Sequence, residues 1–186
     1  TNYTSYETAY EMKSDTGWDD LIALTNTLST TTSANTALLE AKLDIDRTMW
    51  FLAYHNLFVN LDSYIGQFKQ NYYLYKSDNG QFNPTWPLVQ KLLAIPTYKK
   101  RYLAHYKTML AEIVASNGSN YYLTSAQAMQ SLIYADFVAD TNKFSYQTTA
   151  NFTNNLNSTD VSVTGNTAPG ITGLLSARNT YLSALY

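Results

Sequence analysis

Apolar side chains recur at three- and four-residue intervals over most of the chain, and this spacing predicts a mainly helical protein. The first helix is expected at about 17–29, with Thr16 as its cap and Asp19 in its first turn. A helical turn or two is expected at Ala34–Lys42. Further helices are predicted over Trp86–Ile95, over about 98–113 beyond a break at Pro96, and from about Ile171 onward. Another is predicted from Thr124 or Ser125 to about Val138, with its inward residues at Ala128, Leu132, Ala135 and either Phe137 or Val138.

The segment Ile45–Val59 has apolar residues around almost its whole circumference. Such a pattern is typical of a helix that is buried on most sides. Asp44 is placed to cap it. His55 and Asn56 are then expected inside or beside the core, where satisfied polar groups are commoner than ligands.

One stretch has the alternation of a strand. Tyr72–Lys76 is aromatic and alternating, Asp78-Asn79-Gly80 is a tight-turn signal, and Gln81–Asn83 can return as a partner. A β-hairpin is predicted here, whereas Thr159–Thr167 is predicted to be a loop. The expected fold class is therefore mainly α with one small hairpin (α+β), formed as a single unit over residues 1–186.

The composition of the chain argues against several classes of function. Charged residues make up 14% of the chain, tyrosine occurs 17 times, and the net charge is -2. The longest basic run is Lys99-Lys100-Arg101, so nucleic-acid binding is not indicated. With no cysteine and two histidines, thiolate and multi-histidine metal sites are excluded, and any metal would have oxygen ligands. No apolar run reaches the roughly 20 residues of a membrane span.

Most familiar catalytic patterns are missing from the sequence. It has no glycine-rich phosphate loop and no nucleophile motif beside either histidine. Three carboxylate pairs remain as candidates, of which two lie at expected helix starts and the third lies one helical turn apart in a polar setting: Asp44/Asp46, Asp19/Asp20 and Asp136/Asp140. Helix dipoles explain the first two, and the third is expected to be solvated.

Asp62 has a different setting, because its loop follows a buried helix and precedes the predicted strand. A loop held at both ends can position a catalytic group. A phosphotransferase needs a carboxylate to accept the proton of the attacking hydroxyl and an amide oxygen on a magnesium ion. Asp62 and Asn71 supply these two groups, although spacing alone also fits an ordinary turn aspartate.

Four segments, in this order, resemble the CotH family of spore-coat-protein-H-like atypical protein kinases: YEMKSD, DIDRTMWFLAYHNLFVNLDSYIG, NYYLYKSDNGQFNP and WPLVQKLLAIPTYKKRYLAHY. The resemblance implies the C-terminal lobe of a kinase-like fold that uses ATP and Mg²⁺ to phosphorylate serine hydroxyls of proteins. Asp62 would match the catalytic aspartate and Asn71 the metal-binding asparagine. The family also implies a secreted, periplasmic or cell-surface location and a protein substrate or surface partner.

Three departures from the family pattern stand out. Asp62 and Asn71 are nine residues apart here and five apart in many relatives, so Ile65–Gln70 is expected to be a loop insertion. Asn83-Pro84 leads directly to Thr85-Trp86-Pro87, without the Trp-Asp-x-Asn motif whose aspartate holds magnesium in the family. We therefore expect a missing segment at the 84/85 junction, and the nucleotide-binding lysine is expected upstream. These 186 residues alone are expected to be inactive. The alternative is a non-catalytic surface module that binds protein or glycan through its tyrosines.

Overall fold

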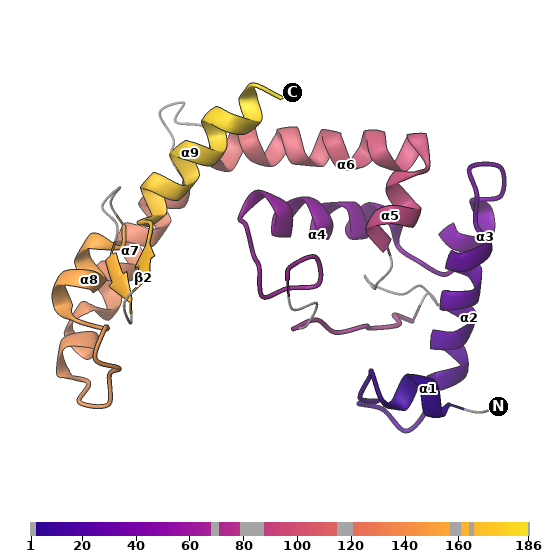
Figure 1. The fold of residues 1–186 in the computed structure, drawn as a ribbon, viewed down its shortest axis with the longest axis horizontal. Helices are drawn as coiled ribbons and strands as arrows, with labels where there is room; N and C mark the ends of the chain where they lie inside the picture. Colours follow the sequence, from indigo (N-terminus) through magenta and orange to yellow (C-terminus); the bar gives the residue numbers. More distant parts are fainter. Residues whose placement is uncertain are drawn as a thin grey trace. The chain divides into compact units, whose positions relative to one another are not determined.

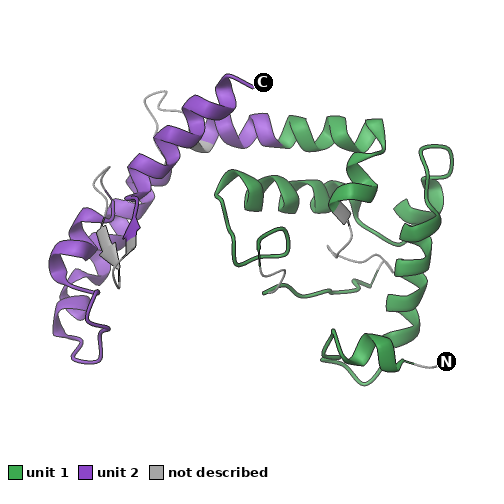
Figure 2. Ribbon diagram, viewed as in Figure 1, with its two compact units in different colours: residues 1–105 green, residues 106–186 purple. Residues whose placement is uncertain are grey.

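A computed structural model describes residues 3–67, 71–78, 88–114, 121–156, 161–163 and 166–185. These residues are mainly helical, as the apolar spacing predicts (Figure 1). The sequence predicts a single unit over residues 1–186, whereas contacts in the structure group the chain into two compact units, 1–105 and 106–186 (Figure 2). Each unit is described by itself below.

The helices of the first unit lie where the sequence predicts them, except for the first one, which is not predicted. They are α1 (Thr4–Glu7), α2 (Trp18–Thr30), α3 (Ala37–Glu40), α4 (Ile45–Leu57), α5 (Leu88–Leu93) and the first part of α6 (Pro96–Met109). The prediction that Thr16 caps α2 is wrong, because Gly17 is the N-cap and no side chain accepts a hydrogen bond there. Gly17 has a φ of 141°, a conformation that a residue with a Cβ rarely adopts.

Helix α4 forms where the all-round apolar pattern predicts it. The side chain of Asp44 accepts a hydrogen bond from the backbone N–H of Arg47 at 3.0 Å, which confirms the cap. Met49 and Leu52 are buried on this helix, and His55 is half-buried. Asn56 is exposed, so its expected place beside the core is wrong. Asn56 lies in the last turn of α4, where its polar side chain reaches water.

The core of the first unit joins α2, α3, α4, α5 and α6 through one cluster of buried side chains: Leu24, Leu28, Leu39, Leu43, Ile45, Met49, Leu52, Tyr64, Leu92, Ile95 and Tyr98. The buried Tyr98 hydroxyl donates a hydrogen bond to Glu40 at 2.7 Å. Such a partner offsets the cost of burying a hydroxyl. Tyr64 brings the loop that follows α4 into this core.

The predicted hairpin after α4 lies only partly within the described residues. Within the described segment 71–78, a single-residue bridge at Lys76 is the sole β pairing. The expected turn and return strand, through Asn83, and the 84/85 junction lie outside the described residues. The described part of the predicted hairpin is an extended, partly buried segment, and its pairing with Gln81–Asn83 stays a prediction.

A hairpin instead occupies the predicted loop 159–167. Strand β1 (Val161–Val163) pairs antiparallel with β2 (Asn166–Ala168), with Ser162 opposite Thr167. The prediction of a loop is wrong because three-residue strands are too short for alternation to mark them. Val161 and Val163 are the β-branched residues that favour this conformation.

The second unit contains the last part of α6, the π-helix η1 (Leu110–Val114), α7 (Tyr121–Ala139), α8 (Thr149–Asn154) and α9 (Ile171–Ser183). Helix α7 begins before the predicted caps Thr124 and Ser125, so both lie inside the helix. The expected inward residues of α7 are exposed: Ala128, Leu132, Ala135 and Val138. Phe137 is the half-buried exception, and its ring stacks on Phe152 of α8 at 4.0 Å between centroids.

Helix α9 forms as predicted, after Gly170 at its N-cap. Its start is held to the end of α8, since the N–H of Ile171 donates to the carbonyl of Asn155 at 2.7 Å. Leu175 and Leu182 are buried on this helix. Arg178 donates a hydrogen bond to the buried Tyr106 hydroxyl at 3.2 Å.

Candidate functional site

Asp62 and Asn71, nine residues apart in the chain, are in direct contact. The Nδ2 group of Asn71 donates to the carboxylate oxygen Oδ2 of Asp62 at 2.7 Å and to the backbone carbonyl of Asp62 at 3.1 Å. Both residues are exposed. The structure thus brings the two predicted site residues together at a surface that a macromolecular substrate can reach.

The orientation of the Asn71 amide follows from its partners. Both partners are oxygens that can only accept, so the amide must present its nitrogen to them. Its oxygen, Oδ1, therefore points away from Asp62, where it is placed to accept a hydrogen bond or a cation. Asn71 has a φ of 57°, a left-handed conformation that asparagine tolerates better than most residues.

The loop that carries Asp62 is tied back to the end of α4. Val59 adopts a left-handed φ of 52°, which is costly for a β-branched side chain. Asn60 then makes two contacts with His55: its N–H donates to the His55 carbonyl at 3.0 Å, and its Nδ2 lies 3.0 Å from His55 Nδ1. Burial lowers the pKa of the His55 imidazole and so favours the neutral ring.

The other side of Asp62 is held just as closely. Ser63 is buried, and its hydroxyl donates to the Asn60 carbonyl at 2.7 Å. The N–H of Gly66 donates to the Ser63 carbonyl at 3.0 Å. A Cβ at Gly66 would lie 1.8 Å from the Leu61 carbonyl oxygen, so this close turn accepts glycine alone.

The segment after Asn71 packs on the same loop. The rings of Tyr72 and Tyr64 meet edge to face with centroids 5.1 Å apart. Burial and a hydrogen bond with Tyr10 raise the pKa of the Tyr72 phenol above its ordinary value. Lys76 forms an ion pair with Asp20 at 2.6 Å, which connects this segment to α2. Asp62 and Asn71 are thus set on two segments that both contact the rest of the unit.

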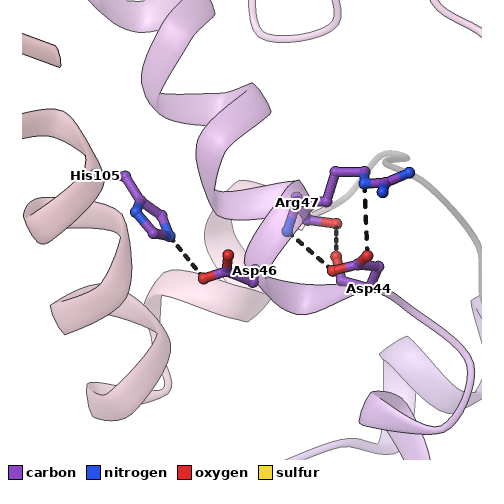
Figure 3. Close-up of polar contacts among 5 residues, drawn as sticks. Asp44, Asp46, Arg47 and His105 are labelled. Atoms are coloured by element: carbon purple, nitrogen blue, oxygen red, sulfur yellow. Dashed lines mark hydrogen bonds and ion pairs between the residues drawn. The ribbon is translucent and has the colours of Figure 1, made fainter. Parts of the chain in front are cut away.

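The three carboxylate pairs in the sequence have structural partners instead of facing each other. Asp44 caps α4, while Asp46 points to His105 of α6, with 2.7 Å between Oδ1 and Nε2 (Figure 3). The His105 ring also stacks on Trp50 at 4.1 Å. These contacts hold α6 against α4.

The remaining two pairs are accounted for in the same way. Asp19 accepts a hydrogen bond from the Tyr3 hydroxyl at 3.0 Å, while Asp20 pairs with Lys76. Asp136 and Asp140 are exposed, and Asp140 accepts a hydrogen bond from the N–H of Asn142 at 2.8 Å. A paired general acid and base is not formed by these residues.

Within the described part of the chain, no three acidic, histidine or cysteine side chains come together as a metal site. The oxygen donors at the candidate site are the Asn71 amide and the Asp62 carboxylate. Mg²⁺ accepts such oxygens and is commonly held by one or two protein groups together with phosphates and water. The donor set therefore fits Mg²⁺ as a partial site. Among the described helices, none has the length and apolar character that a membrane crossing needs.

Residues 1–85 match the family described as CotH kinase protein. No curated protein and no solved structure matches the chain significantly. The similarity to this family is thus found in the first 85 of the 186 residues. The match confirms the resemblance for the first three of the four segments, and it includes both Asp62 and Asn71, whereas the fourth segment lies beyond it. The CotH match ends at Thr85, which is the junction where the sequence departs from the family motif.

Two features that stabilise the loop carrying Asp62 are not predicted from the sequence. Gly66 lies four residues after Asp62, and a glycine after an otherwise bulky stretch is a signal of close backbone approach. The pairing of His55 with Asn60 has no comparable signal, because each residue alone is an ordinary polar position near a helix end. Its five-residue separation becomes meaningful once α4 is known to end at Leu57.

Proposed function

We propose that the CotH-family segment carries the catalytic-loop part of a phosphoryl-transfer site. The site would act within a larger kinase-like fold, of which this chain supplies part of the C-terminal lobe. It would transfer phosphate from ATP, with Mg²⁺, to serine hydroxyls of proteins. The observation that carries this proposal is the 2.7 Å hydrogen bond from Asn71 to the exposed Asp62 carboxylate.

Asp62 is assigned the role of proton acceptor. As the serine oxygen attacks the γ-phosphorus, the hydroxyl proton passes to the Asp62 carboxylate and the bond from phosphorus to the ADP oxygen breaks. The hydrogen bond from Asn71 fixes one carboxylate oxygen, which limits the rotation of the group. A fixed base close to its proton is what general-base catalysis requires.

Asn71 is assigned a second role through its amide oxygen, which would hold Mg²⁺. The ion, when bound, neutralises charge on the phosphates. The same amide then connects the metal to the base, since its nitrogen is donated to Asp62. A second, carboxylate ligand is expected from a Trp-Asp-x-Asn segment, which the sequence lacks after Pro84.

The deciding experiment compares full-length gene product variants in phosphate transfer from radiolabelled Mg-ATP to dephosphorylated casein. Asp62→Asn keeps the size and an oxygen for Asn71 to bond, but removes the base. We expect a fall in kcat of about 10²- to 10⁴-fold. Asn71→Gly places at this position a residue that tolerates the left-handed backbone. This substitution should slow phosphate transfer and raise the Mg²⁺ concentration that the transfer requires.

Asp46→Asn is the matched control, because it makes the same chemical change on α4, in a carboxylate that pairs with His105. It should leave transfer unchanged. The 186-residue chain alone should show no transfer. If Asp62→Asn phosphorylates casein as fast as the wild type, Asp62 is not the base, and the binding of protein or glycan by a non-catalytic module becomes the better account.

The proposal includes a location outside the cytoplasm, either secreted, periplasmic or at the cell surface, where the substrate would be a coat or surface protein. The family resemblance and the composition, which is low in charge and rich in tyrosine, support this. Protease shaving of intact cells checks it, since an exported protein is degraded while a cytoplasmic marker is preserved.

A further inference from the structure

Asn60 and Ser63, which lie on either side of Asp62, are linked to each other, and Asn60 is linked to His55. The backbone enters this loop through Val59 in a left-handed conformation. Because that conformation costs free energy for valine, it persists only where the surrounding bonds stabilise it.

The contact between Asn60 and His55 is chemically directional. The amide Nδ2 of Asn60 is a donor, so the ring nitrogen Nδ1 that it faces at 3.0 Å must accept. A histidine whose Nδ1 accepts is neutral and carries its proton on Nε2. A protonated ring would carry N–H groups on both nitrogens and present a donor to a donor.

The surroundings of the ring also favour the neutral form. Among the residues that the structure describes, the ring contacts are with Phe51 at 4.3 Å, with Tyr54 at 5.4 Å between centroids and with Asn60. Phe51 and Tyr54 lie on the same helix as His55, and Asn60 lies on the loop. No carboxylate or cation is among these partners, and Tyr54 is their sole ionisable member.

We propose that His55 is a positioning residue for the Asp62 loop: its neutral ring accepts a hydrogen bond from Asn60, and protonation of the ring releases residues 59–66. The loop release is a property of this chain alone. Its consequence for phosphoryl transfer, a loss of activity on the acid side as Asp62 loses its position, rests on the proposed function. His55 itself need not touch any substrate.

The direction of the pH dependence follows from the burial of the ring. Burial lowers the pKa of His55 in the folded protein below its ordinary value near 6.5. The stabilisation that the neutral ring contributes is thus complete above that value and is lost as the pH falls towards the folded-state pKa. Weakly acidic conditions should loosen the loop before they unfold the helices.

The experiment uses the fact that the chain has two histidines. His105→Gln leaves His55 as the single imidazole signal in a proton NMR titration. Amide hydrogen exchange then reports on the loop at the N–H groups of Asn60 and Gly66, which donate to His55 and Ser63. Exchange at these two amides, corrected for intrinsic rates, should rise roughly two- to tenfold when His55 becomes protonated. The amides of Leu24 and Leu28 in the buried face of α2 should not follow this titration.

Two substitutions separate positioning from simple packing. His55→Asn offers an acceptor near the place of Nδ1 but does not titrate, so the loop should stay protected at every pH tested. His55→Leu keeps an apolar side chain without an acceptor, so the two amides should exchange fast at every pH. Asn60→Asp should raise the pKa of His55, because a carboxylate then replaces the amide.

One result would overturn the proposal. If exchange at Asn60 and Gly66 is the same with His55 neutral and protonated, the Asn60 amide has turned over to offer its oxygen, and the ring does not control the loop. These measurements need no phosphoryl transfer. An active enzyme that is indifferent to Asp62→Asn would therefore remove the proposed function while leaving the loop result intact.

Discussion

Helices α4 and α7 are both rich in apolar residues, yet they differ in what covers them. On α4, Met49 and Leu52 are fully buried in the core of the first unit. On α7, Met129 and Leu132 are 56% and 75% exposed. The helix that supports the Asp62 loop thus has a packed core beneath it, whereas apolar composition on α7 secures a helix without securing burial. Packing, rather than helix propensity, is what makes α4 a rigid support.

The largest test of this comparison replaces a leucine on each helix. Leu52→Ala removes a fully buried side chain from the cluster and should destabilise the first unit by about 2–5 kcal/mol. Leu132→Ala removes an exposed side chain and should change stability by less than about 0.5 kcal/mol. Urea unfolding followed by circular dichroism and by tryptophan fluorescence measures both.

One outcome of the two leucine substitutions would contradict the difference in burial between α4 and α7. Equal losses at the two positions would show that α7 is covered in solution, by another part of the chain or by a second molecule. Repeating the α7 measurement over a range of protein concentrations separates these cases, because self-association makes stability depend on concentration.

The contrast between the helices also explains how far the sequence alone reaches. The spacing around Ile45–Val59 predicts α4, and Asp44 predicts its start, because both signals are local. The family resemblance selects Asp62 and Asn71 as site residues, but the hydrogen bond between them is known only from the structure. The inward face of α7 is not predictable, since burial requires a partner and nothing in residues 121–139 identifies one.

The extended segments of the chain show a second limit of prediction from the sequence. Among the described residues, Tyr72–Lys76 has the alternation of a strand but pairs only at Lys76. Val161–Val163 forms a strand with too few residues to show alternation. Alternation reports which side chains face a core, and pairing depends on a neighbouring segment. The left-handed backbone of Val59 is hidden for a similar reason: valine is among the residues least suited to it, and only the bonds around the loop explain it.

A smaller test compares the helix caps of the two units. Asp44 and Thr148 each accept a hydrogen bond at 3.0 Å from a backbone N–H three residues later, at the start of α4 and of α8. Alanine at either position should cost about 0.5–2 kcal/mol. We expect the larger loss at Asp44, because its charge also interacts with the helix dipole and lies 3.6 Å from the Arg47 guanidinium.

Salt distinguishes the two caps further. The charge-dependent part of the Asp44 effect should shrink in about 1 M NaCl, where the screening length is about 3 Å, while the Thr148 effect should not change. Thermal unfolding of the wild type, Asp44→Ala and Thr148→Ala at low and high salt checks this. A Thr148→Ala loss that exceeds the Asp44→Ala loss at low salt would contradict the additional charge contribution assigned to Asp44.

The smallest effect concerns the buried hydroxyl of Tyr98 in the core of the first unit. Burial, and then the hydrogen bond to Glu40, raise the pKa of this phenol above its ordinary value. The folded state therefore keeps a proton that the unfolded state loses, so the stability that Tyr98 contributes is complete below about pH 10 and declines as the pH rises further. The loss begins near pH 10 and steepens above that pH.

Tyr98→Phe should flatten the alkaline decline in urea-unfolding experiments between pH 8 and 11, beyond any constant loss from the missing hydrogen bond. Glu40→Gln should retain most of the decline, because burial is the larger cause. An equally steep decline in Tyr98→Phe and the wild type would mean that water reaches this hydroxyl, and that the core under the Asp62 loop is less tightly packed than its contrast with α7 implies.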